Sequence, residues 1–62
     1  MQYFDVTLDF LVGLSRVRPK IKHIPALDAE DAERKALATS TAKVARASGH
    51  DVTVFRTEVS TE

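Results

Sequence analysis

Residues 2–24, QYFDVTLDFLVGLSRVRPKIKHI, carry the strongest structural signal in the chain. Apolar side chains occupy the even positions of residues 2–12, namely Phe4, Val6, Leu8, Phe10 and Val12. A period of two in residues with high β propensity predicts a strand with one buried face. Glycine at the first of two loop positions, Gly13 before Leu14, favours a type II′ turn. The stretch therefore predicts a β-hairpin whose second strand occupies residues 15–24.

The turn fixes the register of this hairpin, because it places Val12 opposite Ser15. The inner pairs are then Phe10 with Val17, Leu8 with Pro19, Val6 with Ile21, and Phe4 with His23. The outer pairs are Asp9 with Arg18, Thr7 with Lys20, and Asp5 with Lys22. A slip of one residue would separate both the apolar set and the opposite charges, so the register is well specified. Because Pro19 has no N–H to donate, we expect the second strand at an edge of the sheet.

Residues 28–49 predict a single helix from Ala29 to about Ser48. Asp28 is a good N-cap, and Gly49 is a typical stop. At about 1.5 Å per residue the helix would be about 30 Å long, enough to cover the hairpin from end to end. The residues expected on its buried side are Ala29, Ala32, Ala36, Leu37, Ser40, Val44 and Ala47.

Residues 51–59, DVTVFRTEV, predict a third strand with an ambiguous face. If Val52 and Val54 meet the helix, Phe55 points to the opposite side of the sheet. Since Pro19 places the second strand at an edge, we expect the third strand to pair antiparallel with the first. The predicted fold class is α+β: one domain over residues 1–62, in the order β-β-α-β, with a three-stranded antiparallel sheet (order 2-1-3) and one helix on one face.

Composition excludes several classes of function. Nine Lys and Arg balance nine Asp and Glu in 62 residues, which argues against bulk binding to nucleic acid or to a membrane surface. The absence of Cys excludes disulfides, and the start of the chain lacks the basic region of a signal peptide. No apolar run approaches the roughly 20 residues that span a bilayer. We therefore expect a cytoplasmic protein, located in the host cytoplasm if a phage encodes it.

The chain carries no motif of a known catalytic type, such as a Gly-rich phosphate loop, HExxH or a nucleophile elbow. His23 is expected on the inner face opposite Phe4, where a lone histidine is more often packed than catalytic. His50 lies in the turn before the third strand. We expect no catalytic residue, no metal site and no cofactor, and hence a protein that is not an enzyme.

The face of the sheet that the helix leaves bare is the predicted binding surface. The apolar anchors expected there are Tyr3, Leu11 and Phe55, with Ile24 and Val59 on the same side. Several such residues on one bare face favour an interaction site, either for a second copy in a homodimer or for a host protein. The edge of the third strand, which lacks Pro, offers a second route to association. The other interpretation is a monomer whose open face is solvated.

A row of cations on the second strand carries two further interpretations. It consists of Arg16, Arg18, Lys20 and Lys22. Their spacing of about 6.6 Å, twice the strand rise, approximates that of successive phosphates and suggests a nucleic-acid-binding ribbon as the alternative function. The row would otherwise pair across the strands with Asp5 and Asp9, and would form the charged rim that selects a protein partner.

The junction of the second strand and the helix, residues 20–38, reads KIKHIPALDAEDAERKALA. A strand followed by A-x-D-x-x-D-A-E-x-x-A at a helix start resembles the layout of small phage and prophage proteins, including some anti-CRISPR inhibitors of similar size and β-β-α-β order. This resemblance implies a regulator or inhibitor that binds a host macromolecule. The resemblance identifies no functional residue in this chain.

Overall fold

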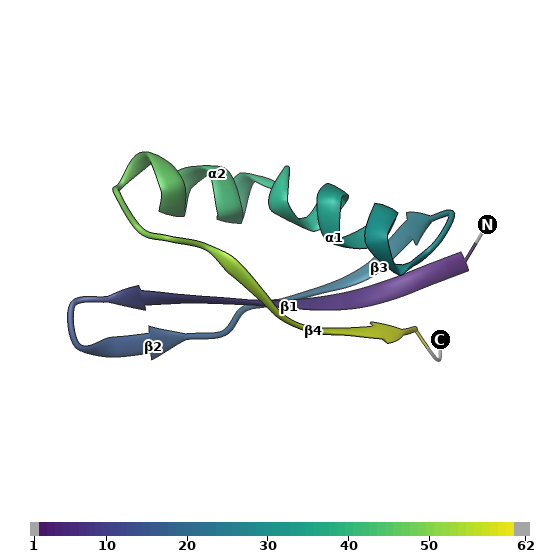
Figure 1. The fold of residues 1–62 in the computed structure, drawn as a ribbon, viewed down its shortest axis with the longest axis horizontal. Coiled ribbons are helices and arrows are strands. Elements are labelled where there is room, and N and C mark those ends of the chain that lie inside the picture. Colours follow the sequence, from purple (N-terminus) through teal and green to yellow (C-terminus); the bar gives the residue numbers. More distant parts are fainter. Residues whose placement is uncertain (1, 61–62) are drawn as a thin grey trace.

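The computed structural model describes residues 2–60 and has an α+β fold, as predicted. Its elements are β1 (Gln2–Val12), β2 (Ser15–Val17), β3 (Lys20–Ala26), α1 (Ala29–Leu37), α2 (Ser40–Ala47) and β4 (Thr53–Val59). The two helices lie on one side of an antiparallel sheet, and the other side has no helix over it (Figure 1). We call this second side the open face.

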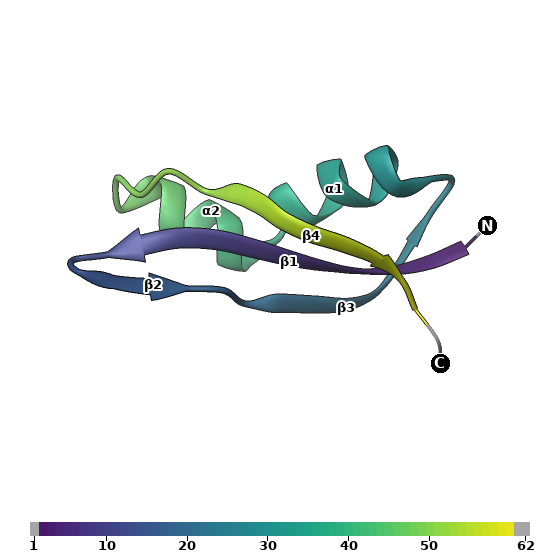
Figure 2. The same ribbon diagram turned by 60° about the horizontal axis from the view of Figure 1, so that its bottom comes forward.

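β2 and β3 are two segments of one edge strand beside β1. Both pair with β1 in the predicted register, which includes Phe10 opposite Val17 and Val6 opposite Ile21. Between them the Pro19 carbonyl accepts a hydrogen bond from the Leu8 N–H at 2.9 Å, so the pairing continues across the proline. Because β4 also pairs with β1, it must lie along the opposite edge. Figure 2 shows β1 between β4 and the β2–β3 segments, which is the expected strand order.

A bulge at His23 overturns one part of the predicted register. Phe4 faces Ile24 and not His23, because an extra residue enters β3 between the pairs of Phe4 and Val6. His23 takes a left-handed φ of 61°, and its N–H donates to the Asp5 carboxylate at 3.0 Å. One extra residue moves all later side chains to the other face. His23 therefore lies on the open face, whereas Ile24 is 7% exposed in the core, so both predicted positions were wrong.

A second bulge resolves the ambiguous face of β4. Val54 faces Leu8 and Arg56 faces Thr7, which leaves Phe55 as the extra residue. Val54 packs against the core under the helices, and Phe55 turns to the open face. Val59 pairs directly with Phe4 and so belongs to the helix side, not to the open face where we expected it.

The predicted single helix is wrong, because it breaks between Leu37 and Ser40. At the break Thr39 is extended (φ −72°, ψ 161°), and its hydroxyl donates to the Ala36 carbonyl at 2.7 Å. Short hydroxyl side chains compete in this way with helical backbone bonding. The Arg46 guanidinium donates to the Leu37 carbonyl at 2.5 Å, which satisfies an acceptor that the break leaves free.

This break changes which side of the second helix is buried. Ala32 and Ala36 of α1 are buried as predicted, but Ala29 is exposed. In α2 the buried residues are Ala42 and Ala45. The three residues expected there are exposed instead, namely Ser40, Val44 and Ala47. The predicted stripe failed because it assumed continuous helical phase through position 39.

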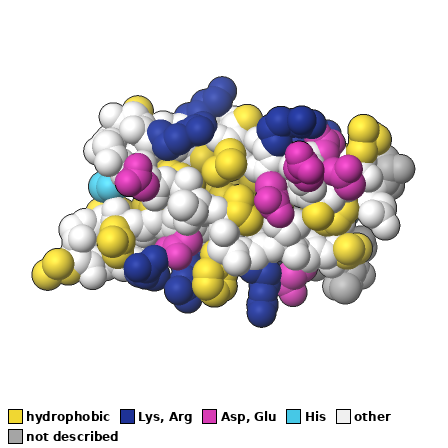
Figure 3. All heavy atoms as spheres, viewed as in Figure 1, with side chains coloured by type: hydrophobic (Ala, Val, Ile, Leu, Met, Phe, Trp, Pro, Cys, Tyr) yellow, Lys and Arg dark blue, Asp and Glu magenta, His cyan; other side chains and the backbone are white. Residues whose placement is uncertain are grey.

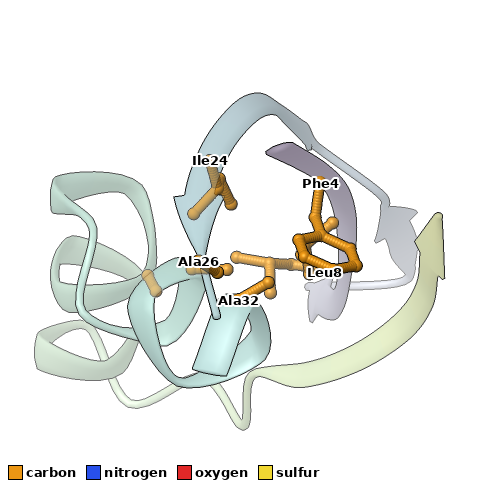
Figure 4. Close-up of a cluster of buried hydrophobic side chains, with 8 residues drawn as sticks. Phe4, Leu8, Ile24, Ala26 and Ala32 are labelled. Carbon is orange, nitrogen blue, oxygen red and sulfur yellow. The ribbon is translucent and has the colours of Figure 1, made fainter. Parts of the chain in front are cut away.

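The core lies between β1, β3 and α1. Figure 4 shows the side chains that meet there, among them Phe4, Leu8, Ile24, Ala26 and Ala32. Val6 and Leu8 are its largest fully buried side chains. The alanines of α1 bring it close to the sheet, but each buries little area. Their own apolar contribution to the stability of the fold is therefore small.

Polar contacts attach α1 to both edges of the sheet. Asp28 is the N-cap, as predicted, and its side chain accepts the Asp31 N–H at 2.8 Å. The Lys35 ammonium donates to the carbonyl of Pro25 in β3 at 2.7 Å. On the other side, the hydroxyl of Thr57 in β4 donates to the Glu33 carboxylate at 2.9 Å.

Neither helix of residues 2–60 is long and apolar enough to cross a membrane.

Asp31 links the stability of this helix start to pH. The Leu27 N–H, 3.1 Å from the carboxylate, and the Arg34 and Lys35 side chains hold the pKa of Asp31 below its ordinary value of 3.8, against an opposing effect of burial. A lowered folded-state pKa means that the charge stabilises the fold above pH 3.8, and that this contribution is lost as pH falls through the folded pKa.

We therefore expect Asp31→Asn to destabilise the protein most at pH 7, with the difference from wild type shrinking below about pH 4. Urea unfolding of both proteins from pH 7 to pH 2 measures this. A difference that stays constant over the whole range would contradict the role given to the Asp31 charge.

Candidate protein-binding surface

Ion pairs occupy the middle of the open face. The Asp9 carboxylate accepts two hydrogen bonds from Nη1 of Arg16, at 2.8 and 3.0 Å, and lies 3.9 Å from Nε of Arg18. Lys20 pairs with Glu58 of β4 at 3.8 Å. Figure 3 shows basic, acidic and apolar side chains interspersed along the sheet side of the molecule. The open face is therefore a charged surface with both signs mixed.

The predicted cation row lies on this face, where two carboxylates, Asp9 and Glu58, compensate half of its formal charge. Arg16, Arg18 and Lys20 each have an acidic partner within 4 Å, and the predicted pairing of Asp9 with Arg18 is confirmed. Asp5, expected opposite Lys22, accepts the N–H of His23. Among residues 2–60 no ion pair is found for Lys22.

Two of the three apolar anchors, Tyr3 and Leu11, lie far apart on the open face. Tyr3, Leu11 and Phe55 are 42%, 48% and 50% exposed. Tyr3 and Leu11 are eight residues apart on β1, which corresponds to roughly 26 Å. The Tyr3 ring stacks on His23 at 4.0 Å between ring centroids, and the Arg18 guanidinium lies 4.0 Å from the centre of the Phe55 ring. Tyr3 and Leu11 therefore do not contact each other, and the rings of Tyr3 and Phe55 pack against His23 and Arg18.

The outer edge of β4 is a surface of another kind. The Ser60 N–H donates to the Tyr3 carbonyl at 2.8 Å, so the backbone of residue 60 points toward β1. Backbone groups of successive strand residues point to alternate edges. Those of Arg56 and Glu58 therefore face β1, whereas those of Thr57 and Val59 point away from it. Within residues 2–60, β1 is the strand that pairs with β4, and this second edge is open.

A groove that sequence reasoning missed lies between α2 and the end of β1. Its volume is about 490 Å³. Phe10, Val12, Val44 and Ala45 line it, and the ring of His50 stacks beside that of Phe10 with 6.0 Å between centroids. Val44 is 66% exposed here because the helix breaks at Thr39. The run Thr39-Ser40-Thr41 was the sequence signal that could have revealed the break and so the groove.

Within residues 2–60 no group of three or more His, Asp or Glu side chains is placed to hold a metal ion. No protein-family model matches the sequence, and no similar curated protein or solved structure was found. We therefore base the functional proposal on the geometry of the sheet and its edges.

The pair of Asp9 and Arg16 allows a quantitative test of the charged face. Asp9→Asn, Arg16→Gln and the double variant form a thermodynamic cycle in urea unfolding. We expect a coupling free energy of about 0.2–1 kcal/mol at low salt, because Arg16 is half-exposed and contacts the carboxylate through Nη1 alone, and a smaller value in 1 M NaCl. A coupling of zero at low salt would contradict a stabilising role for this pair.

Proposed function

We propose that this chain is a non-enzymatic binding protein that pairs the open edge of β4 with an extended segment of another protein chain. The observation that carries the proposal is the outward direction of the Thr57 and Val59 backbone groups. An unpaired strand edge is a template for adding a strand, in which main-chain hydrogen bonds supply affinity and side chains supply specificity.

The opposite edge of the sheet is less suited to this role. There the backbone of Pro25 points away from β1 but has no N–H to offer, and the bulge at His23 interrupts the strand. β4 has no Pro, and its own bulge at Phe55 leaves the segment from Arg56 to Val59 regular. Phe55, just before this segment, and Val59, at its end, are half-exposed, so a strand added there would cover apolar area as well.

The alternative function is nucleic-acid binding by the cation row. Its requirement is that several cations be free to replace the counterions of successive phosphates. The single carboxylate of Asp9 lies within 4 Å of both Arg16 and Arg18, so phosphate would have to displace it to reach them, whereas the exposed pair with Glu58 holds Lys20 only weakly. This arrangement favours protein contact, with the row as a charged rim.

A regulatory or inhibitory role of the phage type, directed at a host protein in the cytoplasm, is the finer form of the proposal. The resemblance of the strand-to-helix layout supports the regulatory role, and the lack of Cys supports the cytoplasmic location. The β4 edge would then be the part that contacts the target.

A displayed library of random ten-residue peptides tests the proposal directly. We expect selected peptides rich in β-forming residues to bind wild type and Val59→Ala, and to bind Val59→Pro at least about tenfold more weakly. Proline removes an outward N–H without breaking a bond to β1, and alanine is the matched control that keeps the N–H. Circular dichroism confirms that each variant is folded.

Equal binding of the peptides to Val59→Pro would contradict a role for the edge, as would failure to select any peptide. Duplex DNA serves as the second probe. A slope near four in log affinity against log salt, lost in the Arg18→Glu/Lys20→Glu variant, would support the ribbon instead.

A further inference from the structure

We propose that the segment that pairs with β4 is β4 of a second copy, with Thr57 opposite the partner's Thr57. This inference rests on the proposed function and names its partner. The two strands would run antiparallel about a two-fold axis, as in most homodimers. The two sheets would join edge to edge into one continuous sheet.

Backbone direction restricts the possible registers. The N–H and C=O groups of Thr57 point outward, so a two-fold axis at this position gives two direct Thr57–Thr57 backbone hydrogen bonds. An axis at Arg56 or Glu58 is also allowed. The residue on the axis then forms a non-hydrogen-bonded pair with its own copy, and the backbone hydrogen bonds come from its outward-pointing neighbours. An axis at Val59 gives direct backbone hydrogen bonds in the same way as one at Thr57, so an antiparallel dimer of the regular part of β4 has four candidate centres.

Charge distinguishes these four registers. An axis at Arg56 places two arginines opposite each other, and an axis at Glu58 does the same with two glutamates. An axis at Thr57 places Arg56 opposite the partner's Glu58, and symmetry repeats this pair. Directly opposed charges of unlike sign stabilise a sheet, whereas like charges destabilise it. An axis at Val59 places Glu58 opposite the partner's Ser60, so it opposes no charges among residues 56–60. Within these residues, the register centred on Thr57 is the one that places unlike charges opposite each other.

Both charged side chains are available for the cross-pair. They lie on the open face, because they are opposite Thr7 and Asp5 of β1, and both residues are exposed. Glu58 also pairs with Lys20 at 3.8 Å, but the two side chains are 46% and 44% exposed. An exposed pair of this kind contributes little, so it does not hold Glu58 away from a partner.

The dimer would also compensate for the small core. A chain of this length buries roughly 60% of its unfolded surface, and here alanines supply much of the interior. A partner that binds only the folded state adds stability by mass action. Pairing of β4 would also bring the exposed apolar residues Phe55 and Val59 of both copies to the seam.

Charge reversal tests the register. Arg56→Glu leaves two acids at positions 56 and 58, and Glu58→Arg leaves two bases, so each variant alone repels its own copy. We expect sedimentation equilibrium to give each single variant a dimer dissociation constant at least about tenfold above that of wild type. An equimolar mixture of the two variants should associate to within about threefold of wild type, because every opposed pair is then attractive.

The Arg56→Glu/Glu58→Arg double variant is the matched control, since it keeps the net charge and exchanges the two positions. It should form a homodimer like wild type. A wild type that is monomeric at millimolar concentration, or single variants that associate like wild type, would overturn the self-pairing. If the wild type is monomeric but peptides still bind in a Val59→Pro-sensitive way, the edge proposal survives and this inference fails. If the wild type is monomeric and no peptide binds in a Val59→Pro-sensitive way, both the edge proposal and the self-pairing are overturned.

Discussion

The burial of one face of β1 under α1 is the constraint that organises this chain. Val6 and Leu8 are fully buried, and Phe4 is 4% exposed beside them. Every other strand pairs with β1, so fixing its inner face also fixes the faces of its neighbours. The β2–β3 segments take one edge of β1 and β4 takes the other. The charged open face and the open edge of β4 both follow from this arrangement.

The helix layer is thin, and polar contacts add to its apolar packing on the sheet. Lys35 attaches α1 to β3, and Glu33 attaches it to β4. α2 packs through Ala42 and Ala45 and leaves an apolar groove beside Phe10. Because the fold encloses little interior volume, its exposed edges and faces are the parts that can bind a partner.

The hairpin could be predicted from sequence because two independent patterns agreed on it. Apolar alternation and opposed charges specify the same register from Val12–Ser15 to Val6–Ile21, and the structure has this register. The prediction failed at His23, where a left-handed residue held by the Asp5 carboxylate inserts a bulge. Local propensity does not reveal such a residue when it is not glycine. In residues 52–59 the conflict between Val54 and Phe55 was itself the signal of a bulge.

The helix and the binding surface were predictable only in part. Strand periodicity placed Tyr3, Leu11 and Phe55 on the open face, but the distances between them depend on how the strands line up. Helical periodicity assigned α1 correctly at Ala32 and Ala36. It failed beyond Thr39, where the hydroxyl of Thr39 donates to the Ala36 carbonyl and the helix ends without a Gly or Pro to indicate the break. The open edge of β4 required the strand order and the direction of its backbone groups together.

Amide hydrogen exchange followed by NMR tests most directly whether the outer edge of β4 is a binding edge. In dilute protein we expect the amides of Arg56 and Glu58 to be protected by β1 and the amide of Thr57 to exchange rapidly. In concentrated protein the Thr57 amide should become protected, because a second strand covers it. A Thr57 amide that exchanges at the same rate at every concentration, or that is already protected in the dilute monomer, would contradict the account.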